Sequence, residues 1–389
     1  MKKTCSAFYL LMLCLFCCKK PYNPPVIAST NSYLVVEGII NSGNDSTSIK
    51  LSKTVNLNSA ITLNPLLGAT VTVESDQHNS YQLIDFRNNG TYASPALNLV
   101  ATQKYRLNIN TPDGHHYLSD YVAVKNTPPI DSIGYTIKDG AAQLYLNTHD
   151  PSNNTRYYRW DYREDWIFHA KYRSEYMLNT ATSTIVPRPL SQQIYYCYAN
   201  DLSSHLLLNS TAKLVKDVVY QTPLTNVPLN SEKLELTYSI YVKQYALTPD
   251  AYQFYLNMQK NTEQLGSIFD AQPSQLAGNI HNVTNPNEPV VGYISVTNSQ
   301  SKIFYLTSAI VPLGTNPTYP YNCEQDTALY RNKQGYNDVQ NVLIDQPITD
   351  LPTDALFTPM GVIYGFLYSS IDCTDCTLRG TLQKPPFWK

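Results

Sequence analysis

The stretch Lys104-Tyr105-Arg106-Leu107-Asn108-Ile109-Asn110-Thr111-Pro112-Asp113-Gly114 shows the structural pattern of this chain in its simplest form. Every second residue from Tyr105 to Ile109 is apolar, so a strand here places its apolar side chains on one face. The Pro-Asp-Gly sequence that follows favours a tight turn, because proline fixes φ and glycine accepts a left-handed conformation. We therefore predict a strand, a turn, and a return strand that carries Tyr117 and Tyr121.

The same alternation recurs through the residues that precede this stretch. Short segments with apolar residues at every second position are separated by turn residues, and no helical spacing interrupts them. The alternating pairs are Leu34 and Val36, Ile49 and Leu51, and Val71 and Val73. Six or seven strands over about ninety residues are typical of an immunoglobulin-like β-sandwich, which we place at residues 31–125.

Asn126-Thr127-Pro128-Pro129 breaks this pattern, and strand alternation resumes at Ile133. We therefore predict a second domain over residues 130–389, a larger β-sandwich. Its strand near residue 160 has Tyr158 and Trp160 on one face, as in the early strands of a fibronectin type III sandwich. Further strands are expected at residues 194–198 and 234–242, and a hairpin at residues 290–306.

One segment of the second domain has helical rather than strand spacing. Thr248-Pro249-Asp250 provides an N-cap, a proline in the first turn and an early acidic residue. The apolar residues that follow recur at helical spacing, and Gly266 closes the segment. We predict one amphipathic helix over residues 249–265 that packs against the second sheet.

The N-terminus is typical of an exported lipoprotein. Lys2 and Lys3 precede a short apolar run that ends at two cysteines, and this run is too short to span a bilayer. Leu15-Phe16-Cys17-Cys18 resembles a lipoprotein box, so residues 1–17 are predicted to be a signal peptide and Cys18 the acylated residue. Cys17 fits the box less well. The proline-containing residues 18–30 are expected to form a tether.

Four cysteines remain in the body of the protein: Cys197, Cys323, Cys373 and Cys376. An even number in an exported chain indicates two disulfides. We favour pairing of Cys373 and Cys376 with the two distant cysteines, and a Cys373–Cys376 bond is the alternative. A zinc site at this Cys-x-x-Cys would need further ligands, and no second metal-binding motif occurs in the sequence, so no metal is predicted.

Composition narrows the functional classes. The chain has 389 residues, a formal charge of −2, 15% charged residues and 32 tyrosines. A body so close to neutral has no basic field for nucleic acid. Nucleotide-binding, nucleophile-elbow and zinc-protease motifs are absent from the sequence, so we predict neither an enzyme nor a cofactor.

Exposed aromatic residues are the feature that most favours recognition. Tyrosine and tryptophan offer rigid contact area with a polar tip, which suits peptide, sugar or protein surfaces. Tyr157 and Arg159 lie on the strand face opposite Trp160, so we predict that they are exposed and contact a ligand or partner. The alternative is that these aromatic residues simply build the core of the sandwich.

Several longer stretches resemble one known family. They are Leu34-Val35-Val36-Glu37-Gly38, Tyr158-Arg159-Trp160-Asp161-Tyr162, residues 265–280, residues 285–293, and the tail around Cys373-Thr374-Asp375-Cys376. Together they resemble the lipoprotein family called domain of unknown function 4249. The resemblance implies an outer-membrane lipoprotein that accompanies a SusC-like, TonB-dependent β-barrel transporter. It implies a role in substrate capture or gating.

The resemblance also directs attention to the loop after the helix. Its polar residues are candidates for contact with a partner or ligand: Asp270, Gln272, Ser274, Gln275 and Asn279. The alternative is that they hydrogen-bond the backbone of their own loop. The cell surface is the expected location, but Lys19 and Lys20 stand where the family often has acidic residues, which leaves the periplasmic face open. A surface adhesion or structural module and a secreted hydrolase are the alternative functions.

Overall fold

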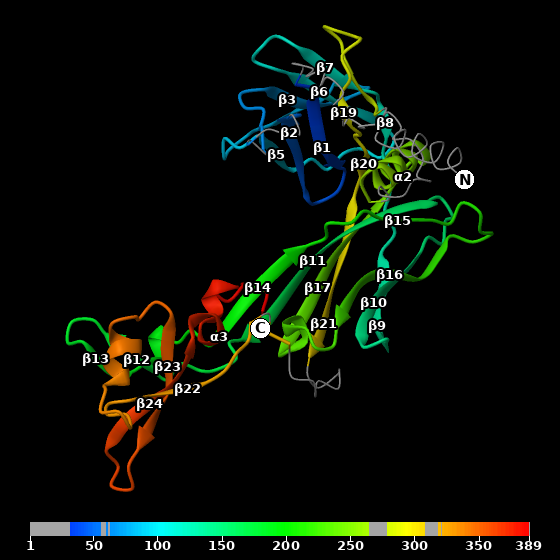
Figure 1. The fold of residues 1–389 in the computed structure, drawn as a ribbon. Coiled ribbons are helices and arrows are strands. Elements are labelled where there is room, and N and C mark those ends of the chain that lie inside the picture. Colours follow the sequence, from blue (N-terminus) through cyan, green and yellow to red (C-terminus); the bar gives the residue numbers. More distant parts are fainter. Residues whose placement is uncertain are drawn as a thin grey trace, which may run out of the picture.

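The computed structural model describes residues 32–55, 60, 63–263, 278–307, 318–319 and 321–388. These residues are mainly β-strand, as predicted, and they form two β-sandwiches and a smaller C-terminal unit that follow one another across the molecule (Figure 1). The predicted signal peptide at residues 1–17, the acylation sites Cys18 and Cys17, and the tether at residues 18–30 lie outside the described residues.

The N-terminal part of the chain forms a β-sandwich of two sheets, as predicted. One sheet contains β1 (Leu34–Asn41), β2 (Ser46–Lys53) and β5 (Thr91–Ala96). The other contains, in order, β7 (His116–Ser119), β6 (Lys104–Asn110), β3 (Thr70–Ser75) and β4 (Ser80–Leu83), with β8 (Val122–Ala123) also beside β6. The alternating apolar residues of β1, β2, β3 and β6 are buried between the two sheets. The period-two pattern therefore identified the core face correctly.

The Pro112-Asp113-Gly114 turn joins β6 to β7 as predicted. Gly114 has φ +86°, and its N–H donates to the carbonyl of Thr111 at 3.0 Å. The carboxylate of Asp113 accepts a hydrogen bond from the Thr111 hydroxyl and contacts Lys53 Nζ at 2.9 Å. These donors lower the pKa of Asp113 to about 2.

The second sandwich repeats the strand order of the first. Its smaller sheet contains β9 (Ile130–Lys138), β10 (Ala141–His149) and β16 (Val218–Pro228). Its larger sheet contains, in order, β14 (Tyr196–Leu202), β11 (Tyr157–His169), β17 (Thr237–Ala246) and β21 (Ser299–Thr307), with β15 (Leu207–Ser210) also on β11. Short 3₁₀ turns are η1 (Leu190–Gln192) and η2 (Glu232–Leu234).

The core of the second sandwich is built around the aromatic residues of β11. Tyr158 and Trp160 are buried and their rings stack with centroids 5.6 Å apart. The indole Nε1 of Trp160 donates to the side chain of Gln244 on β17 at 2.8 Å. A buried tryptophan needs such an acceptor, because its polar N–H would otherwise lose its hydrogen bond to water.

The connection between β17 and β21 leaves the second sandwich and joins the first. After helix α2 (Pro249–Glu263) come β18 (Ile280–Asn282), β19 (Val291–Gly292) and β20 (Val296–Thr297). Strand β18 pairs with β7, whereas β19 and β20 pair with β1. We call residues 278–298 the clasp. It extends both sheets of the N-terminal sandwich at edges that would otherwise be open.

The clasp corrects two expectations from the sequence. The hairpin predicted at residues 290–306 does not form, because β19 and β20 pair with β1 while β21 pairs with β17. Residues 278–298 also fall within the predicted C-terminal domain, although they complete the N-terminal one. The chain therefore passes between the two sandwiches more than once, which no local sequence pattern reveals.

Helix α2 forms as predicted, and its described part ends at Glu263. The Thr248 hydroxyl accepts a hydrogen bond from the N–H of Ala251 at 3.2 Å, which is a typical N-cap. Ala251, Phe254 and Tyr255 are buried against Tyr157 and Leu208 of the second sandwich. The helix thus covers the outer face of β11 and β15.

The C-terminal unit has a core of its own. It contains the hairpin β12 (Tyr176–Asn179) and β13 (Thr184–Pro187), the sheet β22 (Asp326–Leu329), β24 (Ile363–Ser370) and β23 (Asp350–Phe357), and the π-helical turn η3 (Val339–Ile344). Two short helical turns follow, α3 (Ile371–Thr374) and η4 (Cys376–Leu378). Ala328, Val339, Leu343 and Phe366 are buried together, with Tyr176 packed against them.

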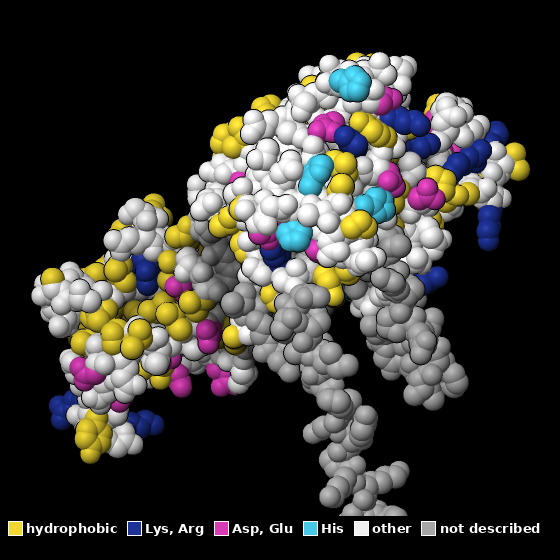
Figure 2. All heavy atoms as spheres, turned by 90° about the horizontal axis from the view of Figure 1, so that it is seen from above, with side chains coloured by type: hydrophobic (Ala, Val, Ile, Leu, Met, Phe, Trp, Pro, Cys, Tyr) yellow, Lys and Arg dark blue, Asp and Glu magenta, His cyan; other side chains and the backbone are white. Residues whose placement is uncertain are grey.

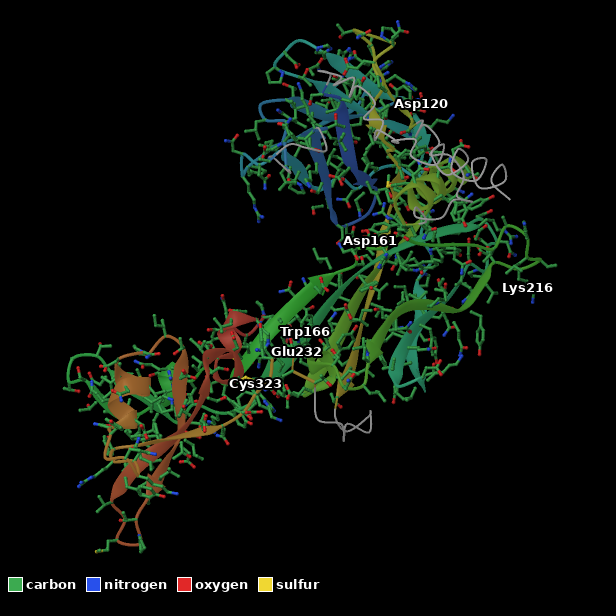
Figure 3. All side chains as sticks on the ribbon, viewed as in Figure 1. Asp120, Asp161, Trp166, Lys216, Glu232 and Cys323 are labelled. Carbon is green, nitrogen blue, oxygen red and sulfur yellow. A yellow bond between two sulfur atoms is a disulfide. The ribbon has the colours of Figure 1, made fainter. Side chains whose placement is uncertain are left out.

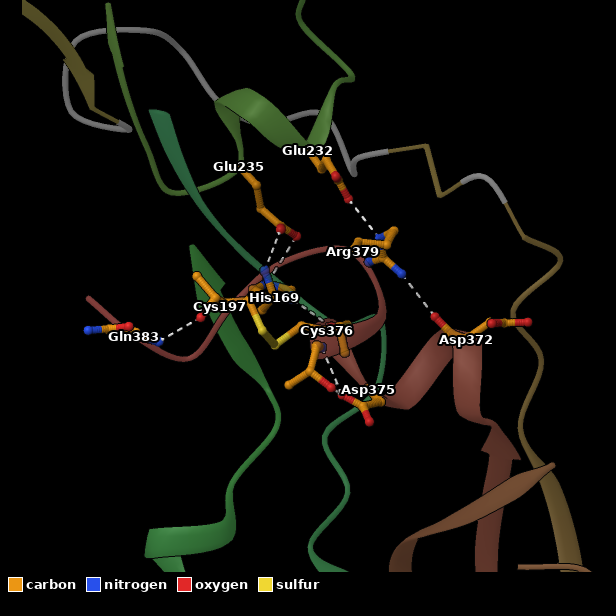
Figure 4. Close-up of a disulfide and its surroundings, with 12 residues drawn as sticks. His169, Cys197, Glu232, Glu235, Asp372, Asp375, Cys376, Arg379 and Gln383 are labelled. Carbon is orange, nitrogen blue, oxygen red and sulfur yellow. Dashed lines mark hydrogen bonds and ion pairs between the residues drawn. A yellow bond between two sulfur atoms is a disulfide. The ribbon is translucent and has the colours of Figure 1, made fainter. Parts of the chain in front are cut away.

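Two disulfides fix this unit: one links it to β14 of the second sandwich, and the other joins the segment before β22 to α3. They join Cys197 to Cys376 and Cys323 to Cys373, so each cysteine of the Cys-x-x-Cys pair reaches a distant partner. This confirms the favoured pairing over a Cys373–Cys376 bond. Figure 4 shows the Cys197–Cys376 bond beside Arg379, which bridges the Glu232 carboxylate and the Asp372 carbonyl.

Candidate binding cleft

The strand β11 places the two predicted contact residues on its outer face. Tyr158 and Trp160 point into the core, so Tyr157 and Arg159 point away from it, as the alternation requires. Their exposure is smaller than predicted, because helix α2 covers this face. The ring of Tyr157 packs against Tyr252 of the helix at 5.0 Å, and the side chain of Arg159 is only 16% exposed.

Arg159 is held in place by one carboxylate and two aromatic rings. Its Nη2 contacts Asp161 Oδ2 at 2.8 Å and its Nε donates to Asp161 Oδ1 at 3.2 Å. The guanidinium also lies over the rings of Tyr255 and Tyr245, at 4.7 and 5.5 Å. Burial opposes its charge, but Tyr255 and Asp161 outweigh burial and raise the pKa of Arg159. The group is therefore a fixed cation.

Arg159 and Asp161 form one wall of a cleft between the two sandwiches. The cleft has a volume of about 270 Å³. The second sandwich contributes these two residues together with Lys243, Tyr245 and Ser299, and the N-terminal sandwich contributes Gly38, Ile39, Asn41, Asp45, Ser46 and Ser48. Figure 3 shows Asp161 at the junction where β11 reaches the N-terminal sandwich. Clefts at domain interfaces are common sites for small ligands.

Polar contacts across the cleft connect its two walls. Asp45, in the connection between β1 and β2, accepts a hydrogen bond from the Ser299 hydroxyl at 2.6 Å and lies 3.7 Å from Lys243 Nζ. Register brings the second-sandwich residues together, because Tyr245 pairs with both Arg159 and Ser299, and Lys243 pairs with Asp161. Burial and the nearby Asp161 raise the pKa of Tyr245, which keeps its hydroxyl protonated as a donor.

This arrangement suits binding by hydrogen bonds and charge. The cleft presents two cations and two carboxylates in alternation, with serine hydroxyls and one tyrosine. A lining of this kind complements a small polar or zwitterionic molecule. No lining residue is a histidine or a cysteine, and Arg159 and Asp161 form an ion pair at 2.8 Å.

In two other cavities, an acidic side chain of the lining is already engaged in hydrogen bonds that stabilise the fold. The cavity of about 460 Å³ beside Ser32 includes Glu288, but this carboxylate accepts hydrogen bonds from the Tyr117 hydroxyl at 2.8 Å and from Asn282 at 2.9 Å. The cavity of about 350 Å³ at the linker includes Asp150, which accepts from the N–H groups of Ser152, Asn154 and Thr155. Glu288 therefore stabilises the clasp, and Asp150 stabilises the turn that follows β10.

The adjacent acids Glu164 and Asp165 on β11 do not form a catalytic pair. Glu164 is buried and accepts hydrogen bonds from Lys233 Nζ and the Tyr238 hydroxyl, both at 2.7 Å. Asp165 is also buried and contacts Arg163 Nε at 2.9 Å. Each acid has its own partners, and adjacent residues of a strand point to opposite faces, so the two carboxylates cannot flank one substrate bond.

The remaining predicted contact residues divide into two groups. Asp270, Gln272, Ser274 and Gln275 lie outside the described residues. Asn279 is buried, and its side-chain amide exchanges two hydrogen bonds with the backbone of Ile294, at 2.8 and 3.0 Å. Asn279 therefore supports the backbone of the clasp, which is the alternative that the sequence left open.

Of the residues that line the cleft, sequence reasoning predicted Arg159 alone; the residues that it missed include Asp45, Lys243 and Ser299. They lie far apart along the chain and carry no motif. Their proximity follows from the register of three strands and from the packing of one sandwich on the other, so only the tertiary structure identifies them.

Within the described ranges, no group of three or more His, Cys, Asp or Glu side chains is placed to hold a metal ion. No helix in the same ranges is both long and apolar enough to cross a membrane.

Comparison with known proteins gives one informative match. No curated protein matches the chain. Among solved structures, Escherichia coli alpha-2-macroglobulin activated by porcine elastase matches with a TM-score of 0.20 and 8% identity, and the match covers 57% of this chain and 19% of that one. A likeness this weak carries no argument. The family model described as domain of unknown function (DUF4249) matches residues 19–303. The match covers the N-terminal sandwich, the clasp and the second sandwich as far as β21, and the chain therefore belongs to the DUF4249 family.

Proposed function

We propose that this protein is an outer-membrane-anchored lipoprotein without catalytic activity, which captures a small polar nutrient for a TonB-dependent transporter. Cys18 carries the lipid anchor in this proposal, and the cell surface is its location. The observation that carries the capture role is the charged cleft between the sandwiches, with Arg159 and Lys243 on one wall and Asp45 opposite.

The character of the cleft supports binding rather than chemistry. Arg159 is pre-organised by its carboxylate and aromatic neighbours, so a ligand would meet a cation whose position is already fixed. Lys243 contacts Asp45 at the longer distance of 3.7 Å, and both side chains are partly exposed. This pair can open to contact a ligand at small energetic cost.

The capture role is tested by comparing wild-type protein with a Lys243→Gln variant. Panels of dipeptides and short oligosaccharides are screened by thermal shift and calorimetry. We expect at least one class to bind, and Lys243→Gln to weaken its binding about tenfold, as expected for loss of one charge-assisted hydrogen bond. Lys302→Gln is the matched control, because Lys302 lies on β21 and contacts backbone carbonyls outside the cleft. Equal weakening by both variants would argue against the cleft.

The transporter association is tested on the native lipoprotein. The protein is purified in mild detergent, and mass spectrometry identifies its partners and its lipidated N-terminal peptide. We expect a large β-barrel to co-purify, acylation at Cys18, and loss of growth on one nutrient when the protein is deleted. A protein that always purifies alone would refute the accessory role, and a cell-attachment defect without a nutrient phenotype would favour the adhesion alternative.

A further inference from the structure

The C-terminal unit carries exposed apolar side chains at one end of its sheet. The hairpin between β23 and β24 ends at Met360, which is 91% exposed, and Val362 beside it is 62% exposed. The neighbouring turn after β22 adds exposed Tyr336. We call residues 330–336 and 357–364 the apolar tip. Figure 2 shows hydrophobic side chains gathered over this unit, with Lys and Arg side chains near its edge.

The two segments of the apolar tip are adjacent in space. Strand β22 pairs with β24 from Asp326–Tyr368 to Leu329–Gly365, and the N–H of Tyr330 then donates to the carbonyl of Tyr364 at 3.1 Å. Both turns therefore leave the sheet at the same end. The hairpin projects from the unit in Figure 1, at the end of the molecule away from the N-terminal sandwich.

Hydrogen bonds hold both turns in shape. In the hairpin, the N–H of Thr358 donates to Val362 at 2.8 Å, and Gly361, with φ +78°, donates to Thr358 at 2.9 Å. In the other turn, Asn332 donates to Tyr336 at 2.9 Å. Exposed turn positions usually carry Asp, Asn, Ser or Gly, so the presence of methionine at the apex is unusual. The tip displays its apolar side chains on a pre-formed scaffold.

The charges around the apolar tip are mainly positive. Arg331 and Lys333 are exposed, and neither makes an ion pair with any described residue. Asp338 is the one acid within residues 329–338 and 355–366, and it accepts a hydrogen bond from Asn332. Exposed cations beside an apolar apex complement a surface that has anionic groups on its outside and an apolar interior beneath them.

We propose that the apolar tip inserts into the interfacial region of a lipid bilayer that carries anionic headgroups. Met360, Val362 and Phe357 enter the acyl boundary, because burial removes their exposed apolar surface from water. The tyrosines lie at headgroup level, where amphipathic rings are enriched. Arg331 and Lys333 contact the anionic headgroups. A narrow convex apex suits a fluid membrane better than the flat, wide patches of stable protein interfaces.

This inference goes beyond the proposed function and does not require the lipid anchor. It is tested with a chain that begins at Lys19, which lacks the predicted leader and acylated cysteine. Co-sedimentation is measured with vesicles of phosphatidylcholine alone and with vesicles that also contain phosphatidylglycerol. We expect binding that is stronger to the anionic vesicles and that falls as salt rises. Failure of wild-type protein to bind either vesicle overturns the proposal.

Variants at the apex identify the tip as the contact. Met360→Ser with Val362→Ser is expected to lower the partition coefficient at least tenfold, because two apolar side chains no longer leave water. Arg331→Gln with Lys333→Gln removes the preference for anionic vesicles. Val215→Ser is the matched control, because Val215 is 93% exposed but lies on the second sandwich, and this variant is expected to bind as wild type does. Unchanged binding of the apex variant overturns the proposal.

A label reports insertion directly. Met360→Cys and Val215→Cys are each labelled with an environment-sensitive fluorophore, since the four cysteines of the body are in disulfides. Only the label at residue 360 is expected to brighten when vesicles are added. If instead the protein self-associates in solution and Met360→Ser abolishes this, the tip is an interface between copies, and the membrane proposal is wrong.

Discussion

The two sandwiches share a strand order but are completed in different ways. The N-terminal sandwich contains no cysteine within its described strands, and it is completed by the clasp, whose strands come from a connection of its neighbour. The second sandwich contributes that connection to its neighbour, and the Cys197–Cys376 disulfide links its strand β14 to the C-terminal unit. Equivalent sheets can thus be stabilised by strand addition in one place and by covalent cross-links in another.

Two of the stretches that resemble the family have different structural roles, which correspond to these two ways of completing a sandwich. Residues 285–293 form the part of the clasp where Glu288 bonds to Tyr117 and where Gly292 lies against β1. The Cys373-Thr374-Asp375-Cys376 stretch forms the attachment of the C-terminal unit. Both stretches are structural in the described residues, so their particular sequence reflects how the parts are joined.

Removing the Cys197–Cys376 disulfide is expected to have the largest effect. The bond closes a sequence separation of 179 residues, so replacing both cysteines by alanine is expected to cost about 5 kcal/mol in the chain-entropy model. Loss of Cys323–Cys373, with a separation of 50, is expected to cost about 4 kcal/mol. Hydrogen exchange should increase in β14 and the C-terminal unit and remain unchanged in β1 and β2. Equal loss of protection in the N-terminal sandwich would contradict the division of roles.

Gly292→Ala is expected to weaken the N-terminal sandwich by about 3 kcal/mol. Gly292 has φ +145°, and an added Cβ would lie 2.3 Å from the carbonyl oxygen of Val36, so β19 must move away from β1. Gly140→Ala is the matched control, because Gly140 also has a positive φ of +74° but has open space around it. The control is expected to cost about 1 kcal/mol. Hydrogen exchange of β1 and β7 measures the loss, and similar effects of both variants would count against the clasp.

Acid is expected to weaken one turn in each sandwich. The Thr111 hydroxyl and Lys53 lower the pKa of Asp113 to about 2. Burial alone would raise the pKa of Asp150, but the hydrogen bonds that it accepts from Ser152, Thr155 and Asn154 outweigh burial and lower this pKa to about 2. Both values lie below the ordinary 3.8, so the stabilisation is present above about pH 4 and is lost as the pH falls through 2.

Asp113 is exposed and Asp150 is half-buried, so solvent screening limits each contribution to about 1 kcal/mol. Asp113→Asn and Asp150→Asn are compared in urea unfolding between pH 2 and 5. Each variant should flatten the pH dependence of its own sandwich, and no change in either would show that these turns do not contribute.

The sequence predicted the individual elements well and their connections poorly. Alternation at Tyr105, Leu107 and Ile109 identified the buried face, and the N-cap and Pro249 identified helix α2. These signals are local, because strand period and capping depend on neighbouring residues. The clasp depends instead on pairing between Val291 and Val35, which are distant in the chain, and a short apolar segment is equally compatible with a hairpin.

The same limit applies to the candidate cleft. Arg159 was predicted because its strand face could be inferred from Trp160, but its partial burial under helix α2 could not be. Asp45 and Lys243 have no local signal, since a single acid in a turn and a single lysine on a strand are common at solvated surfaces. Their meeting depends on how one sandwich packs on the other.

Asp45→Asn is expected to have the smallest effect on stability. The size of this effect shows whether the strands of the clasp or the polar contacts across the cleft hold the two sandwiches together. The Asp45–Lys243 pair is partly exposed at 3.7 Å, so its loss should change the unfolding free energy by at most about 0.5 kcal/mol. The Ser299 hydroxyl can still donate to the asparagine oxygen. A loss above about 1.5 kcal/mol in urea unfolding would mean that polar contacts across the cleft, and not the strands of the clasp, hold the two sandwiches together. A small loss leaves Asp45 free to serve ligand binding, because a group that contributes little to stability can exchange its partner at little cost.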